Sequence, residues 1–136
     1  MSHAIETLIP HRAPMRFIDA LVECTDTSAV ATTCFNADSF AVSDGLVLEA
    51  ALVECVAQTV AAALGQRGRQ PGQAERLGNG MLVAVSNFKI TSRPPAEKTL
   101  RIEVRELKRL GLMLMISGNI TCEGHPVAGG EMTLYA

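Results

Sequence analysis

The sequence is poor in aromatic residues and in the long apolar runs that mark membrane proteins. It has no tryptophan, one tyrosine and four phenylalanines among 136 residues. No window of about 18 uninterrupted apolar residues occurs, and the N-terminus shows no basic segment followed by an apolar run. We therefore expect neither a membrane partner nor a signal peptide, and we expect a cytosolic protein.

The four cysteines form no CxxC pair and are widely spaced. They are Cys24, Cys34, Cys55 and Cys122. This spacing argues against a zinc site and against the dense disulfide framework of small secreted domains. We expect buried, reduced thiols, with no metal and no cofactor.

Charge is low and nearly balanced. Twelve Lys and Arg residues against fourteen Asp and Glu residues give a net charge of -2, with no basic run. This balance argues against a nucleic-acid partner. Hydrophobic residues make up 48% and charged residues 19%, as is typical of folded globular proteins. The length predicts a single domain over residues 1–136.

The pattern of apolar residues predicts a short N-terminal helix over residues 3–11 and six strands. The predicted strands cover residues 15–23, 28–35, 81–90, 99–110, 112–122 and 125–136. Within 99–110, Leu100, Ile102 and Val104 alternate with Arg101, Glu103 and Arg105. Such alternation is typical of an antiparallel strand with one face in water. The polar segment 66–80 is expected to be a connector.

One long helix is predicted over residues 45–65, "GLVLEAALVECVAQTVAAALG", which has no internal glycine or proline. Ser43 or Asp44 would cap its start and Gly65 would end it. Apolar residues cover nearly the whole helical wheel, so the helix must be surrounded by protein. The order of elements predicts an α+β fold, with an antiparallel sheet of five or six strands wrapped around the helix. The exposed edge of such a sheet predicts dimerisation.

Glu54 is a carboxylate inside this apolar helix, and Gln58 lies one turn further on the same face. Two interpretations stay open. Glu54 is either a structural carboxylate with satisfied hydrogen bonds, or an acid–base residue. Glu49 lies in the first turns of the predicted helix, where the helix dipole favours a carboxylate, and a solvated side chain is the simpler explanation for it. His11, held between two prolines, is the strongest histidine candidate, although a structural hydrogen bond is the simpler role for it.

Two separated motifs resemble the hot-dog-fold dehydratases that act on 3-hydroxyacyl groups carried by acyl carrier protein. The segment "LIPHRAPMRFID" is similar to that family's PHR-x-P segment followed by an aspartate, which is Asp19 here. The segment "LVECVAQ" resembles its helix motif, in which a glutamate is followed four residues later by a glutamine. The spacing of "SNFKITSRPP" after the helix fits as well, so the resemblance covers nearly the whole chain.

The resemblance implies a hot-dog fold and an acyl substrate bound to acyl carrier protein or to CoA. It implies that Glu54 is the catalytic carboxylate. Backbone N–H groups of Gly45 and Leu46, at the expected helix start, would polarise the thioester carbonyl. In the family, a histidine from the loop before the helix is the base, and the carboxylate comes from across the dimer interface.

The chain departs from the family at that histidine. Counting back from Glu54, its position falls on Phe40, and no histidine occurs between His11 and His125. This combination resembles a divergent branch of predicted hydroxyacyl-carrier-protein dehydratases that is found with aryl-polyene pigment pathways. In those pathways it accompanies another dehydratase of the same fold.

Three functions remain open. The first is a dehydratase in which Glu54 acts as acid or base, Gln58 orients it and His11 assists, with Phe40, Gly45 and Leu46 near the substrate. The second is a catalytically weak subunit that pairs with an active hot-dog dehydratase. The third is a thioesterase, because a carboxylate on this helix can also activate water. The protein would therefore be a homodimer, or a heterodimer with another hot-dog protein.

An acidic carrier protein would need a basic landing site on this chain. The sequence offers two candidate groups for it, namely Arg105, Lys108 and Arg109, or Arg67 and Arg69. Ordinary solvated charges are the simpler explanation for each of these residues.

Overall fold

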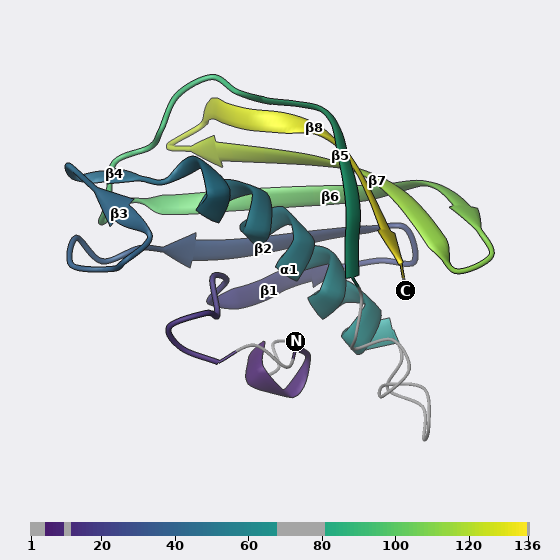
Figure 1. The fold of residues 1–136 in the computed structure, drawn as a ribbon. Helices are drawn as coiled ribbons and strands as arrows, with labels where there is room; N and C mark the ends of the chain where they lie inside the picture. Colours follow the sequence, from purple (N-terminus) through teal and green to yellow (C-terminus); the bar gives the residue numbers. More distant parts are fainter. Residues whose placement is uncertain (1–4, 10–11, 68–80, 136) are drawn as a thin grey trace.

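A six-stranded antiparallel sheet wraps around one helix in the computed structural model, which describes residues 5–9, 12–67 and 81–135 (Figure 1). The order of strands in the sheet is β1-β2-β6-β7-β8-β5, with antiparallel pairing throughout. The strands are β1 (Ala20–Cys24), β2 (Ser28–Cys34), β5 (Met81–Ile90), β6 (Thr99–Leu110), β7 (Met113–Cys122) and β8 (His125–Tyr135). The predicted α+β architecture is confirmed.

The helix α1 (Glu49–Arg67) lies against the concave face of the sheet (Figure 1). Leu100, Ile102 and Val104 of β6 are buried beneath it, whereas the alternate residues of that strand are exposed. Gly118 of β7 permits this close packing, because a Cβ atom there would collide with the side chain of Val56. Within the described residues, no helix is long and apolar enough to cross a membrane.

The predicted start of the helix at Gly45 is wrong. Two short strands, β3 (Val42–Ser43) and β4 (Leu46–Val47), form a separate hairpin there. Its turn residues Asp44 and Gly45 have φ angles of 56° and 77°. A two-residue hairpin turn of this kind needs positive φ at both positions, which Asp-Gly supplies. Neither Ser43 nor Asp44 therefore caps α1, which begins after Leu48.

The predicted end of the helix at Gly65 is also wrong, since α1 continues to Arg67. Gly65 is needed inside the helix for a packing reason. A Cβ atom at that position would collide with the backbone carbonyl of Leu8. A glycine chosen for close approach and one chosen to end a helix look the same in a sequence.

Arg93 holds the β3–β4 hairpin against the rest of the chain. Its Nε donates to the carbonyl oxygen of Val47 at 3.0 Å, and its Nη2 donates to those of Ser43 at 2.8 Å and Leu46 at 2.9 Å. The hairpin leads directly into α1, so this contact helps to set where the helix begins.

The N-terminal predictions are partly corrected. The helix expected over residues 3–11 is a single 3-10 turn, η1 (Ile5–Thr7), within the described part of that range. The first strand begins at Ala20 rather than at residue 15. Among the described residues before it, Met15 and Phe17 bond to the side chain of Gln58, and only Asp19 donates its N–H to the neighbouring strand, at the carbonyl oxygen of Thr32 in β2. Most of the expected connector lies outside the described residues.

The prediction of buried thiols is confirmed for two cysteines and wrong for Cys34. Cys55 and Cys122 are buried, Cys24 is half-buried and Cys34 is exposed at the end of β2. Burial raises the pKa of the Cys55 thiol, and the nearby carboxylates of Glu54 and Asp19 raise it further. Burial raises the pKa of Cys122 as well, with an added contribution from Glu123.

Candidate active site

Gln58 ties the segment before β1 to the helix. Its side chain is 1% exposed. The Oε1 atom accepts a hydrogen bond from the backbone N–H of Phe17 at 2.8 Å, and Nε2 donates to the carbonyl oxygen of Met15 at 2.8 Å. The same nitrogen donates to Glu54 Oε1 at 3.1 Å. The predicted contact between Gln58 and Glu54 is therefore present, and it is one part of a larger network.

Glu54 faces a cleft of about 420 Å³, which we call the Glu54 cleft. Its walls are largely apolar and include Met15, Phe17, Phe40, Ala41 and Ala51. Among the described residues that line it, Glu54 alone has an ionisable side chain. The carboxylate is half-buried and is not sealed in the core. Such a position can present a carboxylate to a mostly apolar ligand.

Phe40, which counting back from Glu54 predicted to occupy the position of the dehydratase histidine, lines the same cleft as Glu54. Its side chain is 56% exposed, and its ring centroid lies 5.8 Å from that of Phe17. None of the described residues that line the cleft is a histidine. His125 is exposed at the start of β8, and His11 lies outside the described residues.

Gly45 and Leu46 do not stand at the start of α1, so the predicted placement of their N–H groups at the helix N-terminus is wrong. Both belong to the β3–β4 hairpin, where the Gly45 carbonyl oxygen accepts a hydrogen bond from Ala96 N–H at 2.9 Å. Leu48 and Ala50 stand at the start of α1 and line the cleft. The Asp-Gly pair was the signal in the sequence that could have located the hairpin.

Met15 and Phe17 are cleft residues that the sequence did not reveal. They reach the cleft because their backbone groups bond to the side chain of Gln58. The sequence shows that Gln58 on a buried helix needs hydrogen-bond partners. It does not show which distant backbone groups will provide them.

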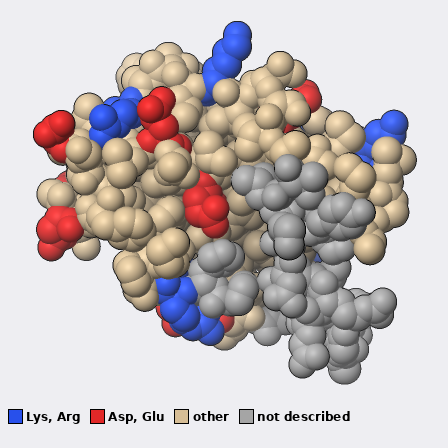
Figure 2. All heavy atoms as spheres, in the orientation of Figure 1, with Lys and Arg blue, Asp and Glu red and all other residues tan. Residues whose placement is uncertain are grey.

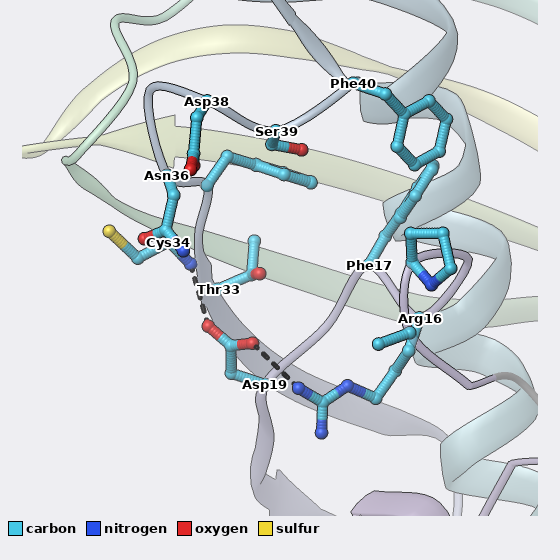
Figure 3. A pocket seen from close by; sticks show the side chains of 12 residues that line it. Arg16, Phe17, Asp19, Thr33, Cys34, Asn36, Asp38, Ser39 and Phe40 are labelled. Atoms are coloured by element: carbon cyan, nitrogen blue, oxygen red, sulfur yellow. Dashed lines mark hydrogen bonds and ion pairs between the residues drawn. The ribbon is translucent and has the colours of Figure 1, made fainter.

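A second cleft of about 510 Å³, the polar cleft, adjoins the first (Figure 3). Phe17 and Phe40 line both clefts. Asp19, from the N-terminal motif, lies in the polar cleft. Its Oδ2 accepts a hydrogen bond from Cys34 N–H at 2.9 Å, and its Oδ1 lies 3.7 Å from Arg16 Nη2. Asp19 and Glu54, one from each sequence motif, therefore lie in two clefts that share the rings of Phe17 and Phe40.

On the face shown in Figure 2, the described Lys and Arg residues are scattered and form no single basic patch. Arg105, Lys108 and Arg109 are exposed towards the β6–β7 turn, at the opposite end of the molecule from the β3–β4 hairpin (Figure 1). Arg67 donates to the carbonyl oxygen of Thr25 at 2.9 Å. Arg69 lies outside the described residues.

A six-stranded antiparallel sheet wrapped around one long helix defines a hot-dog-fold protein, as the sequence resemblance implied. The chain belongs to the ApeP-like family, whose model, described as ApeP dehydratase, matches residues 3–136. It is thus a hot-dog protein of the dehydratase type. No curated protein sequence matches the chain significantly.

Several solved structures share the fold. The dehydratase heterocomplex ApeI:P from Xenorhabdus doucetiae matches with a TM-score of 0.84 at 20% identity, over 98% of this chain and 90% of that chain. A Streptococcus mutans protein bound to acetyl CoA matches with a TM-score of 0.69 at 14% identity, over 92% and 91%. A hypothetical thioesterase with coenzyme A from Streptococcus pneumoniae matches with a TM-score of 0.67 at 16% identity, over 85% and 82%.

Proposed function

We propose that this protein is the carboxylate-bearing subunit of a dehydratase that acts on 3-hydroxyacyl thioesters carried by acyl carrier protein or CoA. A second hot-dog subunit supplies the histidine that this chain lacks at position 40. The observation that carries this proposal is the placement of Glu54. It is the one ionisable group among the described residues that line an apolar cleft, and Gln58 orients it.

The reaction removes a proton from C2, breaks the C3–O bond and releases water, leaving a double bond between C2 and C3. One group must accept the C2 proton and another must donate a proton to the leaving hydroxyl. Glu54 is proposed as the group for the second step, with the apolar walls holding the acyl chain beside it. The histidine of the partner accepts the C2 proton. His11 is proposed to assist, and Phe40 to contact the acyl chain.

An open sheet edge supports pairing with another subunit. β5 lies at the edge of the sheet, and its residues from Ala84 to Asn87 are exposed, with Val85 at 45%. Exposed edge strands with apolar side chains are normally covered or paired. The similar structure from Xenorhabdus doucetiae is a dehydratase heterocomplex, ApeI:P. The open edge supports pairing in general, and the likeness to this heterocomplex favours a heterodimer over a homodimer.

The test is reconstitution with a histidine-containing hot-dog dehydratase and a 3-hydroxyacyl carrier protein. We expect the mixture to form the 2-enoyl product and the isolated chain to be nearly inactive. Glu54→Gln should lower the rate of the mixture by a factor of about 100 or more, while size-exclusion chromatography still shows the complex. Glu49→Gln is the matched control, because Glu49 is an exposed carboxylate in the first turn of the same helix.

Other outcomes would identify the two alternatives. A rate that depends on this chain but not on Glu54 would assign it as a catalytically weak partner subunit. Release of free thiol instead of an enoyl product would show that the protein is a thioesterase. The likeness to the hypothetical thioesterase from Streptococcus pneumoniae is the reason to test for this activity. Reversing the charges of Arg105, Lys108 and Arg109 should weaken carrier binding if the carrier docks there, with a reduced dependence on salt.

A further inference from the structure

Glu97 has an unusual backbone conformation. Its φ angle is 66°, in the left-handed region that residues other than glycine rarely adopt. Of the other described non-glycine residues with positive φ, Asp44 and Glu123 each precede a glycine in a two-residue hairpin turn, and Asn87 lies at a bulge of β5. Glu97 is followed by no glycine and lies outside the strands. Strained residues often mark places where function requires a fixed geometry.

Glu97 bonds twice to the loop between β2 and β3, which we call the Phe40 loop (residues 35–41). Its backbone N–H donates to the carbonyl oxygen of Phe35 at 2.8 Å. Its Oε2 accepts a hydrogen bond from the backbone N–H of Ala37 at 2.6 Å. The strained conformation therefore directs both the backbone and the side chain of one residue to the same loop.

The two phenylalanine rings that line both clefts are held by different residues. Gln58 holds Phe17 by accepting from its backbone N–H at 2.8 Å, and Glu97 holds the loop that carries Phe40. The centroids of the two rings lie 5.8 Å apart (Figure 3). Glu97 itself lines neither of the two clefts. It can therefore influence the clefts only through the loop.

We propose that Glu97 is a positioning residue that keeps the Phe40 ring beside the Phe17 ring, and so fixes the wall that the acyl chain contacts. The hold on the loop follows from the geometry, whereas the effect on an acyl substrate rests on the proposed function. The carboxylate serves here as the acceptor for one N–H group. An amide oxygen with the same reach can replace it, because it is an acceptor too.

A matched pair of amide variants separates this role from a purely local one in the turn. Glu97→Gln keeps both the acceptor and its reach. Glu97→Asn keeps the acceptor but shortens the side chain by one methylene group, and asparagine adopts positive φ more readily than most residues. A role limited to the turn predicts that the asparagine variant is as good as the glutamine variant or better. Our proposal predicts the opposite order.

Amide hydrogen exchange of the isolated chain, followed by nuclear magnetic resonance, tests the hold on the loop. Glu97→Asn should speed exchange of the Ala37 N–H about three- to tenfold, the loss of one hydrogen bond, whereas Glu97→Gln should change it less than about twofold. Glu123→Asn is the matched control, because Glu123 also has a positive φ, of 51°, and lines neither cleft. Equal exchange in Glu97→Asn and in this control would overturn the proposal.

A fluorescent reporter tests the position of the ring itself. The chain has no tryptophan, so Phe40→Trp introduces a single one. Adding Glu97→Asn to this variant should increase quenching of the tryptophan by acrylamide, because the loop is no longer held against the rest of the chain. Adding Glu97→Gln should leave the quenching unchanged. Equal quenching in both double variants would overturn the proposal.

Kinetics of the reconstituted enzyme connect the loop to the substrate. Glu97→Asn should raise KM for the acyl substrate about three- to tenfold with kcat nearly unchanged, because a wall contact acts equally on substrate and transition state. Glu97→Gln should keep the KM of the unmodified chain. Faster exchange with an unchanged KM would overturn the proposal. An inactive mixture with the unmodified chain would contradict the proposed function, while exchange and quenching, which need no turnover, would still decide the role of Glu97.

Discussion

Gln58 Nε2 lies 3.1 Å from Glu54 Oε1, one helical turn away, and 2.8 Å from the carbonyl oxygen of Met15. The orientation of the carboxylate and the position of the segment before β1 therefore depend on the same side chain. The network joins the two sequence motifs that first suggested the family. It also places Met15 and Phe17 beside Glu54 in the cleft.

Gln58→Leu should lower the free energy of unfolding by about 2–4 kcal/mol, because the buried N–H of Phe17 and the partly buried carbonyl group of Met15 would lose their partner. Urea unfolding measures the change. Thr59→Val is the control. Thr59 is also buried, but its hydroxyl bonds only to Cys55 within the helix, so its loss should cost less than about 1 kcal/mol. Equal costs for the two variants would contradict the role given to Gln58.

Phe40→His should place a base in the cleft that already holds Glu54. We expect the isolated chain to gain dehydration of a 3-hydroxyacyl thioester, by a factor of about 100 over the unmodified chain. Enoyl formation at neutral pH measures the gain. Phe40→Leu is the control, because it removes the phenylalanine ring from the cleft without adding a base. If the histidine variant stays inactive alone while wild type works with its partner, the two positions do not form an acid–base pair.

Gly118→Ala should destabilise the fold by about 1–3 kcal/mol, because the added methyl group collides with Val56 and overpacks the core. Thermal or urea unfolding measures the loss. Combining it with Val56→Ala removes the collision. The double variant should therefore be more stable than the sum of the two single effects predicts. Simple additivity would show that the helix does not pack on the strand at this point.

Stability should fall at alkaline pH because of Cys55. Its pKa is raised in the folded state, so the folded protein keeps the thiol proton while the unfolded chain loses it above about pH 8.5. The free energy of unfolding should then decrease with pH, by up to about 1.4 kcal/mol per pH unit for this thiol. Unfolding measured between pH 7 and pH 10 tests this. Cys55→Ala should flatten the curve, and an unchanged slope would assign the effect to other groups.

Local patterns made the architecture predictable. Strict alternation in residues 99–110 identified β6 and its buried face, and the apolar segment around Glu54 identified a helix enclosed by protein. Helix boundaries were less predictable. The apolar run concealed the Asp44–Gly45 turn, and Gly65 resembled a helix stop although the backbone of Leu8 requires a glycine there.

The sequence by itself determined the α+β order of elements, the family resemblance, and the presence of Glu54 and Gln58 one turn apart. These follow from side-chain periodicity and from short-range spacing, which the chain carries locally. Only the tertiary structure decided that Phe40 and Glu54 share a cleft, and that Met15, Phe17 and Arg16 line its surroundings. Those contacts join segments separated by up to 43 residues along the chain. They depend on backbone hydrogen bonds and packing between distant elements, for which no local pattern exists.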